Sequence, residues 1–541
     1  MIEFQHRLPA MSIPENGHNG TYNNEELAIP GILTTKDPVL GKFMQLLRKN
    51  IYSGRALIFL DGRYMMVNKN WIRDYVYIMK GMKYFECKML PFLDFIIETQ
   101  REDGQYYELV KQMDDYHWKM VDEDCRILYP EDNLSLVRLE LEADIEFLVV
   151  EGALCQYRIE GDDAWLEKVL PKLERGIDYV TSDPKRWDAA HGLVKRAYTI
   201  DMWDFTDDPR CPSDRRIHEN EPMCAMHGDS SGVYRAMLDL AWLNRRLDRE
   251  EAAQNWEKRA AQLRENIFRY LWNGSFFIHQ LPLNCAPMDE KENMRLSLSN
   301  VYDINRGLTD WEQSRSIIEA YRNRRGKTDS FAEWFTIDPP YEQFLSYRAG
   351  EYVNGAVSPF TAGELAKAAF CSGYEAYGWD ILSRFIRLAE RDGDVYFLYD
   401  PDSAPQNQRG PSTWGAAALL SAIDEGLAGI VNTDVNYRRI RFSPRFPVTP
   451  YEELRYFTGY EKTDTIIDVK YILTPEGMRY DMTSPAEAIR GHFLLPEGKR
   501  CAKLLVNGRE TAFAEERIGD SLYVNADAAA EKTTRFEILF A

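Results

Sequence analysis

Residues 231–272 read "SGVYRAMLDLAWLNRRLDREEAAQNWEKRAAQLRENIFRYLW", and this stretch decides the fold class of the chain. Apolar residues recur three and four positions apart in both halves, which is the period of an amphipathic helix. The two halves, 231–247 and 250–272, are separated by Asp248 and Arg249 alone. Such a short link between two helical segments predicts a helical hairpin.

The same helical period recurs from about residue 37 to about residue 426. The other segments that carry it are 37–50, 134–157, 163–180, 310–323, 361–370, 374–390 and 413–429. Short links alternate with long ones, and the longest loops are predicted at 182–228, 273–308, 324–358 and 392–412. About a dozen helices joined in this way predict a closed ring of helical hairpins, whose long loops gather on one face and carry the function.

The pattern changes after about residue 435. Ile467, Val469, Tyr471 and Leu473 follow at a period of two, and Asn507–Gly508 is typical of a hairpin turn. We therefore expect a mainly α chain that forms an (α/α)6 toroid with a small C-terminal β-sandwich. The expected parts are an irregular N-terminal segment (1–36), the helical barrel (37–434) and the β-rich C-terminal domain (435–541).

The composition is typical of a globular protein, with 45% hydrophobic and 28% charged residues among 541. The formal net charge of −20 argues against binding of nucleic acids or of anionic membranes, because phosphate groups are bound by clustered Lys and Arg. Aromatic residues reach 13%. This share fits either a bulky core or a protein that stacks sugars on aromatic faces.

The eight cysteines are scattered along the chain and form no CxxC pair, and the histidines form no HxxxH pair. We therefore expect reduced thiols, no metal site and no cofactor. The N-terminus has no basic start followed by an apolar run, and the chain has no stretch of 18 apolar residues. These features predict a soluble, cytoplasmic protein.

Residues 199–208, "TIDMWDFTDD", place four carboxylates around Trp203 and Phe205. Packing against aromatic rings desolvates a carboxyl group and raises its pKa, as the general acid of glycoside cleavage requires. We interpret Asp204, which lies between the two rings in sequence, as this acid, and Asp201 as a ligand of sugar hydroxyls. The structural alternative is an acidic loop that caps a helix.

Residues 70–82, "NWIRDYVYIMKGM", place Arg73 and Asp74 next to Trp71 inside an apolar helical run. An adjacent donor and acceptor beside an aromatic ring suit a sugar with neighbouring hydroxyls. The alternative is an Arg–Asp pair that serves the structure alone.

Two later stretches are weaker signals. Residues 350–370 contain Glu351, a tight turn predicted at Asn354–Gly355, and a helix that starts near Pro359. In residues 409–430, "RGPSTWGAAALLSAIDEGLAGI", a polar loop leads into an Ala-rich helix.

Taken in order, these four stretches resemble the six-hairpin (α/α)6 glycosidases, a superfamily that includes glucoamylases, trehalases, YgjK-like glucosidases and rhamnosidases. "WIRD" (71–74) resembles the segment whose Arg–Asp grips the terminal sugar, and "MWDFT" (202–206) is similar to the segment that carries the general acid, at the position of Asp204. "EYVNGAVSP" (351–359) resembles an Asn-Gly segment that lines the sugar pocket, and 412–430 resembles the last barrel helix. The resemblance covers about residues 37 to 450.

The chain departs from this pattern at one point. Many relatives carry the general base as a Glu ahead of the last helix, whereas Phe397 and Leu398 stand there in this chain. By their surroundings in the sequence, the candidates for the base are Glu351, Glu333 and Asp400, and we favour Glu351 because it adjoins the Asn-Gly turn.

The resemblance implies an exo-acting, inverting glycoside hydrolase with Asp204 as the acid and Glu351 or Glu333 as the base. The residues expected to contact the oligosaccharide or glycoside are Trp71, Arg73, Asp74, Asp201, Trp203, Asn354, Gln408 and Trp414. Two alternatives stay open. Loss of the base is compatible with a phosphorylase that holds phosphate at "NQRGPST" (407–413), or with a barrel that binds oligosaccharide without cleaving it.

Overall fold

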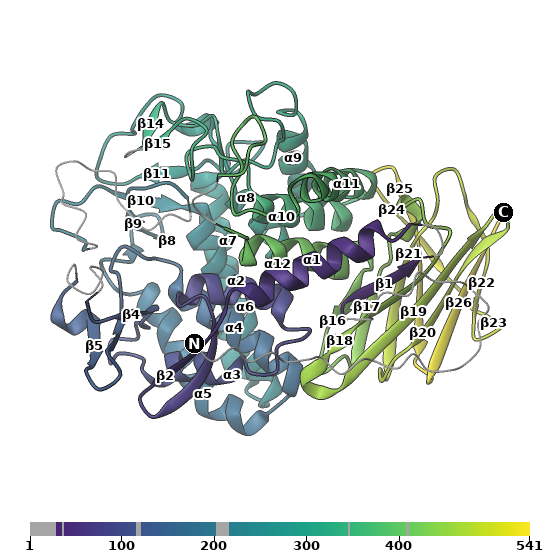
Figure 1. Ribbon diagram of the computed structural model, residues 1–541, viewed down its shortest axis with the longest axis horizontal. Coiled ribbons are helices and arrows are strands. Elements are labelled where there is room, and N and C mark those ends of the chain that lie inside the picture. The colour runs from purple at the N-terminus through teal and green to yellow at the C-terminus, as the bar shows by residue number, and fades with distance from the viewer. Residues whose placement is uncertain (1–28, 35–36, 115–120, 202–215, 345–346, 407–409) are drawn as a thin grey trace.

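The computed structural model describes residues 29–34, 37–114, 121–201, 216–344, 347–406 and 410–541. Six helices of this part of the chain form an inner ring. They are α2 (Ile72–Met82), α4 (Ile145–Glu160), α6 (His227–Arg246), α8 (Ser299–Asn305), α10 (Pro359–Cys371) and α12 (Thr413–Ser421). Each packs against the next one along the chain, and α12 packs back against α2 (Figure 1). The predicted closed ring of helices is therefore present.

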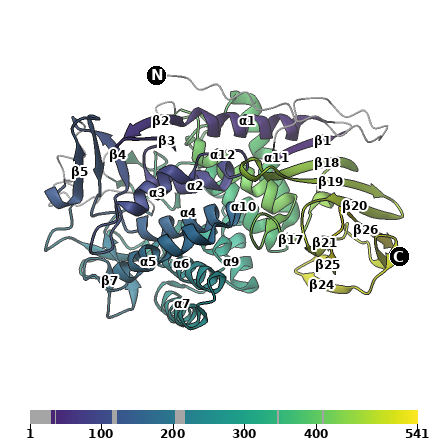
Figure 2. The ribbon, with the colours of Figure 1, turned by 90° about the horizontal axis from the view of Figure 1, so that it is seen from below.

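Six further helices surround this ring. They are α1 (Val39–Ser53), α3 (Leu90–Glu98), α5 (Asp163–Val180), α7 (Glu250–Leu271), α9 (Trp311–Arg322) and α11 (Glu375–Asp392). Each contacts one or both of the inner helices that flank it in sequence, and α1 also packs against α12. In Figure 2, α1 and α7 lie at opposite edges, with α2 and α4 between them. The hairpin predicted at 231–272 corresponds to α6 and α7.

Two details of the helix prediction are wrong. Residues 134–144 are not helical, because Leu134–Val137 form strand β6 and α4 begins only at Ile145. In "LSLV", Leu134 and Leu136 are separated by one polar residue, which is the period of a strand rather than of a helix. The predicted loop 273–308 contains the short inner helix α8, whose seven residues are too few to give a clear helical period.

Glycines let the inner helices approach one another closely. A Cβ atom at Gly81 of α2 would lie 2.8 Å from the Cα of Ala417 in α12. A Cβ atom at Gly363 of α10 would lie 2.5 Å from the carbonyl carbon of Ala418. Backbone therefore meets backbone on both sides of α12, which explains why this helix is rich in alanine.

The centre of the ring is filled by one buried cation. The guanidinium of Arg306, at the end of α8, donates hydrogen bonds to the carbonyl oxygen of Gly228 (2.8 Å), to Ser231 Oγ (2.8 Å) and to the Tyr77 hydroxyl (3.2 Å). Its Cζ also lies 4.9 Å from the ring centroid of Phe147. One side chain thus joins α2, α4, α6 and α8.

Aromatic rings fill the rest of the centre. Tyr77 of α2 stacks on Trp414 of α12 with ring centroids 4.6 Å apart, and Phe360 of α10 also stacks on Trp414, at 4.6 Å. The indole N–H of Trp414 donates to the Tyr302 hydroxyl of α8. The ring is therefore a packed core rather than an open channel.

The long loops fold into small sheets beside the N-terminal ends of the inner helices. Their strands are β2 (Arg55–Leu60), β3 (Arg63–Asn68), β4 (Leu109–Gln112), β5 (Arg126–Tyr129), β6 (Leu134–Val137), β7 (Trp187–Asp188), β8 (Leu193–Val194), β9 (Arg196–Ala197), β10 (Met223–Met226), β11 (Gln280–Pro282), β12 (Leu296–Ser297), β13 (Ile337–Asp338), β14 (Gln343–Phe344) and β15 (Tyr347–Arg348). Strand β10 leads directly into α6, and β12 ends just before α8. Most of these sheets lie at the end of the ring that faces away from the C-terminus, as predicted for the loops (Figure 1).

The C-terminal part contains two sheets. The first has seven strands in the order β1-β18-β19-β20-β26-β22-β23, and the second has five in the order β16-β17-β21-β25-β24. Their bounds are β1 (Gly31–Thr34), β16 (Ile430–Asn432), β17 (Arg439–Phe442), β18 (Glu453–Tyr460), β19 (Thr465–Thr474), β20 (Gly477–Thr483), β21 (Ala488–Leu494), β22 (Cys501–Val506), β23 (Arg509–Glu510), β24 (Ala514–Ile518), β25 (Ser521–Ala529) and β26 (Thr533–Phe540).

Aromatic side chains join the two sheets. Phe442 and Phe493 of the five-stranded sheet pack against Tyr480 of the seven-stranded sheet, and Phe493 also packs against Phe536. The predicted strand at 467–473 is confirmed as β19, and the predicted turn at Asn507–Gly508 joins β22 to β23. One expectation is wrong: residues 31–34, expected to be part of an irregular segment, pair with β18 as strand β1.

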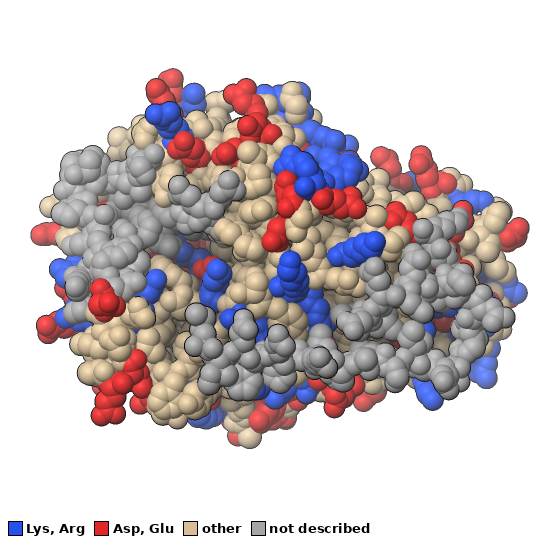
Figure 3. Space-filling view, in the orientation of Figure 1, with Lys and Arg blue, Asp and Glu red and all other residues tan. Residues whose placement is uncertain are grey.

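The charged surface is mixed on the face seen in Figure 3. Acidic and basic side chains are interspersed there over the helical part and over the C-terminal sheets. Within the described residues, every helix is too short or too polar to cross a membrane.

We predict that Gly363→Ala lowers the unfolding free energy by about 2 kcal/mol or more, because the new methyl group would meet backbone atoms that have no room to move. Gly41→Ala in α1 is the matched control: its methyl group would have one close neighbour, the Ile32 carbonyl oxygen at 3.1 Å. The gain in helix propensity should keep this variant within about 1 kcal/mol of wild type. Urea denaturation measures the unfolding free energy of both variants. Equal losses in Gly363→Ala and Gly41→Ala would contradict the role given to Gly363.

Candidate active site at the mouth of the helical ring

The N-terminal end of α2 carries the first predicted site residues. Trp71 is the half-buried residue just before the helix, and its backbone pairs with Leu109. Arg73 is buried, and its guanidinium binds both oxygens of Asp144 at 2.6 and 2.8 Å and also contacts Glu142. Asp74 stays half-buried, and burial raises its pKa. Trp71 and Asp74 thus keep part of their surface exposed, whereas Arg73 is occupied by Asp144.

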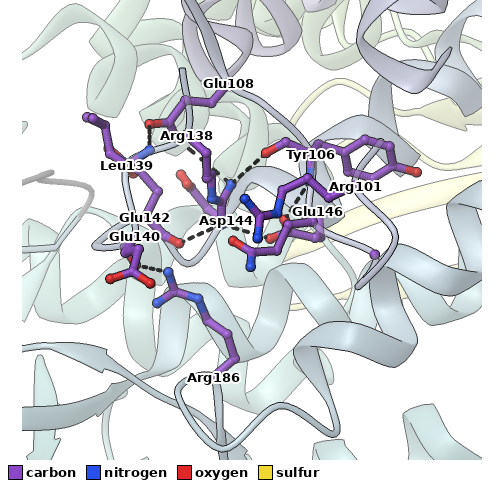
Figure 4. Close-up of polar contacts among 12 residues, drawn as sticks. Arg101, Tyr106, Glu108, Arg138, Leu139, Glu140, Glu142, Asp144, Glu146 and Arg186 are labelled. Atoms are coloured by element: carbon purple, nitrogen blue, oxygen red, sulfur yellow. Dashed lines mark hydrogen bonds and ion pairs between the residues drawn. The ribbon is translucent and has the colours of Figure 1, made fainter. Parts of the chain in front are cut away.

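A buried network of charges supports this end of the ring (Figure 4). Arg138 donates to the carbonyl oxygen of Glu142 (2.9 Å) and to Glu146 Oε2 (3.3 Å), and it lies 3.9 Å from Glu108 Oε2. Glu108 Oε1 accepts the Leu139 amide at 2.7 Å. Burial raises the pKa of Glu108 to about 8, although Arg138 opposes the shift. This carboxyl group therefore carries a proton at neutral pH.

Asp229, in the first turn of α6, is a site residue that the sequence analysis missed. Its side chain is 5% exposed, its Oδ1 lies 3.6 Å from the Arg196 guanidinium, and its Oδ2 has no hydrogen-bond partner among the described residues. Burial raises the pKa of Asp229 to about 6; Arg196 opposes this, and the carboxylates of Asp144 and Asp201 add to it. The sequence pattern predicts a helix that begins only at Ser231, which leaves Asp229 in a loop.

The side chain and the backbone amide of Asp201 are both hydrogen-bonded. Its Oδ1 accepts the Ser299 hydroxyl (2.8 Å), its Oδ2 accepts the Ser299 amide (3.0 Å), and its own amide donates to His279 Nε2 (3.0 Å). Burial alone would raise the pKa of Asp201, but His227, His279 and the neighbouring serine hydroxyls outweigh it and hold this pKa below its usual value. The carboxylate predicted to bind sugar hydroxyls is thus occupied at the start of α8.

A chain of three hydrogen-bonded side chains, Ser297, His227 and Asp303, lies close to Asp201. His227 Nδ1 lies 2.6 Å from Asp303 Oδ2, and His227 Nε2 lies 2.9 Å from Ser297 Oγ. Burial lowers the pKa of His227, but the Asp303 carboxylate outweighs it and raises this pKa. All three side chains are fully buried, so the serine has no access to a substrate. The chain instead ties the start of α6 to α8 and to β12.

The two predicted bases differ in their surroundings. Glu333 is buried and accepts hydrogen bonds from Arg384 at 2.5 and 2.9 Å and from the Tyr377 hydroxyl at 2.7 Å. Burial raises the pKa of Glu333, but Arg384 outweighs it, so the group stays an ion-paired carboxylate. Glu351 is exposed, and its Oε2 accepts the Arg348 amide. Both oxygens of Glu333 are thus occupied by partners, whereas Glu351 keeps solvent access.

The remaining predicted site residues have structural contacts. The Asn354 side chain accepts the Tyr341 amide (2.9 Å) and donates to the carbonyl oxygens of Tyr341 and Tyr347. Trp414 lies in the aromatic centre of the ring. Ser412 Oγ accepts the Gly415 amide and caps α12, so one of the amides at this helix start is already satisfied.

Three predicted residues, Trp203, Asp204 and Gln408, lie outside the described residues. Within the described ranges, no group of three or more His, Cys, Asp or Glu side chains is arranged to hold a metal ion. At the position of the expected base, Phe397 packs against Phe360 and Leu398 is buried.

No family model and no curated protein sequence matches the chain. Solved structures do match. The α-L-rhamnosidase from Dictyoglumus thermophilum aligns with a TM-score of 0.62 at 10% identity over 95% of this chain and 50% of its own. The Streptomyces avermitilis α-L-rhamnosidase complexed with L-rhamnose aligns with a TM-score of 0.59 at 12% identity, over 94% of this chain and 42% of its own. The GH63 mannosylglycerate hydrolase from Thermus thermophilus aligns with a TM-score of 0.50 at 16% identity, over 71% of this chain and 100% of its own.

The chain therefore shares the fold of these glycoside hydrolases. This confirms the fold that the resemblance implied. The chain spans about half or less of the length of the rhamnosidases that it matches. At these identities the likeness concerns the fold. The reaction has to be argued from the side chains at the mouth of the ring, which is the end where the inner helices begin.

We predict a specific pH dependence of stability from Glu108. Its folded pKa of about 8 lies above the ordinary value of 4.5, so the folded state holds a proton that the unfolded state releases. The resulting stability is present at low pH and is lost as the pH rises from about 4.5 through 8. Relative to Glu108→Gln, wild type should lose about 4 kcal/mol of unfolding free energy between pH 5 and pH 9.

Urea denaturation at a series of pH values tests this prediction. Glu123→Gln is the control, because the Glu123 side chain is 94% exposed and should leave the pH profile unchanged. Parallel pH profiles of wild type and Glu108→Gln would contradict a protonated Glu108.

Proposed function

We propose that the protein is an exo-acting, inverting glycoside hydrolase that removes a terminal sugar from an oligosaccharide or glycoside by general acid/base catalysis. The observation that carries this proposal is the group of carboxyl groups at the N-terminal ends of the inner helices, with Asp74, Asp144 and Asp229 on three of them. Hydrolysis of a glycosidic bond needs two carboxyl groups with different proton affinities facing one sugar.

The packed centre of the ring supports exo action. Arg306 and the stack of Tyr77, Trp414 and Phe360 close the ring beneath the mouth. A sugar chain that reaches the mouth therefore cannot thread through the ring.

Asp204 is the proposed general acid, with Trp203 as its aromatic neighbour. The resemblance of "MWDFT" (202–206) to the segment that carries the general acid supports this role for Asp204. Asp201, three residues earlier in the sequence, is bound to the start of α8.

Asp229 is the carboxyl group that fits the general base best. With a pKa of about 6 it is ionised at neutral pH, and its Oδ2 has no hydrogen-bond partner in the described part of the chain. It can therefore take a proton from the attacking water. Glu351 remains the second candidate, because it is exposed and is the base favoured from the sequence.

Substrates with different leaving groups test the two roles. Asp204→Asn should slow the cleavage of a glycoside with an alkyl or sugar leaving group by about 10²- to 10⁴-fold, because the departing oxygen is no longer protonated. A dinitrophenyl glycoside leaves without a proton, so its cleavage should be slowed far less. Asp229→Asn removes activation of water and should slow both substrates alike.

Glu351→Gln is the matched control for Asp229→Asn. If it slows both substrates while Asp229→Asn does not, Glu351 is the base. NMR of the first product tests inversion, because an inverting enzyme releases the opposite anomer. Release of a sugar 1-phosphate when phosphate is added would instead identify a phosphorylase, and binding of oligosaccharide without turnover by wild type would contradict an enzyme.

The pH profile gives an independent prediction. A base with a pKa of about 6 must be deprotonated to act, so kcat/KM should fall tenfold per pH unit below about pH 6. The measurement uses wild type and the dinitrophenyl glycoside, for which the acid is not needed. A rate that stays constant down to about pH 4.5 would exclude Asp229 as the base.

A further inference from the structure

A cavity of about 220 Å³ lies at the end of the ring opposite the candidate active site. Its walls come from α2, α4, α6, α8 and α10 and from residues 421–425 after α12. The other side of the cavity is closed by the C-terminal part, with Asn432 in β16, Tyr460 in β18 and Tyr437 between β16 and β17. The cavity thus lies between the helical ring and the C-terminal sheets, which adjoin each other in Figure 1.

The charge of this cavity is opposite to that of the chain. Six basic residues line it, namely Lys80, Lys83, Arg158, Arg235, Arg306 and Lys367. Three acidic residues line it, namely Glu151, Asp239 and Glu425. Two further carboxylates lie close to the lining residues. Glu364 is bound to Lys80, and Asp424 accepts a hydrogen bond from the Tyr456 hydroxyl. A positive excess remains even so, in a chain whose net charge is −20.

Two lysines share one carboxylate in this wall. Lys83 Nζ and Lys367 Nζ both bind Glu425, one on each oxygen, and Lys367 also donates to Ser421 Oγ at 3.1 Å. Burial lowers the pKa of both lysines, but Glu425 outweighs it and raises both above the usual value. All three groups are therefore charged, and the triplet carries one net positive charge.

Arg158 adds a second positive charge, and within the described residues no carboxylate forms an ion pair with it. Its guanidinium lies over the Trp242 ring at 5.0 Å, and its buried Nε finds no acceptor among the residues that the structure describes. A buried donor without an acceptor is unfavourable. A ligand that supplies oxygen atoms to Arg158 would remove this cost.

Basic residues at the C-terminal ends of helices can also serve to balance the helix dipole. Lys80 and Arg158 lie in the last turns of α2 and α4 and fit this structural role. Lys367 does not, because it lies in the interior of α10, and Arg235, in the interior of α6, is paired with Asp239. Helix dipoles alone therefore leave part of this positive cluster unexplained.

We propose that this cavity binds a small phosphate-bearing anion, held by Arg158, Lys83 and Lys367. A phosphate monoester carries a charge of about −1.5 to −2 at pH 7, which matches the positive excess. Its oxygens accept hydrogen bonds from ammonium and guanidinium groups. The cavity has room for about seven waters at roughly 30 Å³ each, enough for a phosphate with a small organic group. This site is independent of the glycosidase proposal.

Isothermal titration of the full-length protein with inorganic phosphate, at constant ionic strength, tests the proposal. Wild type should bind one phosphate with a Kd below about 1 mM. Arg158→Gln should weaken binding at least tenfold, and it leaves no carboxylate without a partner. Lys168→Gln is the control, because Lys168 is exposed on α5 and should bind phosphate like wild type. Malonate in place of phosphate distinguishes a carboxylate site from a phosphate site.

Lys367→Gln is the second variant, because Glu425 keeps Lys83 as its partner; it should weaken phosphate binding as Arg158→Gln does. Thermal unfolding without phosphate separates two roles of Arg158: a ligand-binding role predicts an unchanged or raised midpoint in Arg158→Gln, and a purely structural role predicts a lowered one. The proposal is overturned if wild type shows no saturable binding up to about 10 mM. It is also overturned if both variants bind phosphate as wild type does, because the phosphate would then lie elsewhere. Tighter binding of malonate than of phosphate would overturn it as well.

Discussion

The closure of α12 against α2 is the constraint on which the rest of the structure depends. A ring of six helices exists only if the last packs against the first, and this contact joins segments more than 300 residues apart in sequence. Gly81 and the alanines of α12 allow backbone to meet backbone there, and Arg306 and Trp414 fill the space inside. Once the ring is closed, the N-terminal ends of the inner helices share one end of the molecule, and the loops before them can only gather there.

This geometry explains why the carboxyl groups at the mouth differ so much in proton affinity. Burial favours the protonated form of each, while nearby cations and hydrogen-bond donors favour the ionised form. Glu108, with a single amide on one oxygen, reaches a pKa of about 8; Asp229, beside Arg196, reaches about 6; and Asp201, with two donors and two histidines nearby, falls below its usual value. A site that must both donate and accept protons requires such a spread.

The sequence predicted those parts of the structure that depend on local periodicity. The hairpin of α6 and α7 and the strand β19 follow from apolar spacing alone, and the resemblance of four short stretches led to the correct fold. What failed depended on tertiary contacts. Strand β6 is paired by β4 and β5, α8 is held by Asp201 and His227, and strand β1 exists only because β18 lies beside it. Asp229 was missed because the period of α6 becomes clear only after its first turn. Arg73 was expected as a sugar ligand from its place beside Trp71 and from the resemblance, and Asn354 from the resemblance; neither signal reveals the partners that occupy these side chains.

Helix dipoles contribute to the charge at both ends of the ring. Helix N-termini are electropositive and tolerate buried carboxylates, whereas C-termini are electronegative and tolerate lysine and arginine. The inner helices therefore favour Asp74, Asp144 and Asp229 at the mouth, and Lys80 and Arg158 at the cavity between the ring and the sheets. Arg306 belongs to both ends: it lines the cavity, and its guanidinium binds the carbonyl oxygen of Gly228, the residue before Asp229. An anion in the cavity would face the same cation that holds the first turn of α6. The electrostatics of the cavity and the position of Asp229 are thus connected through a single side chain.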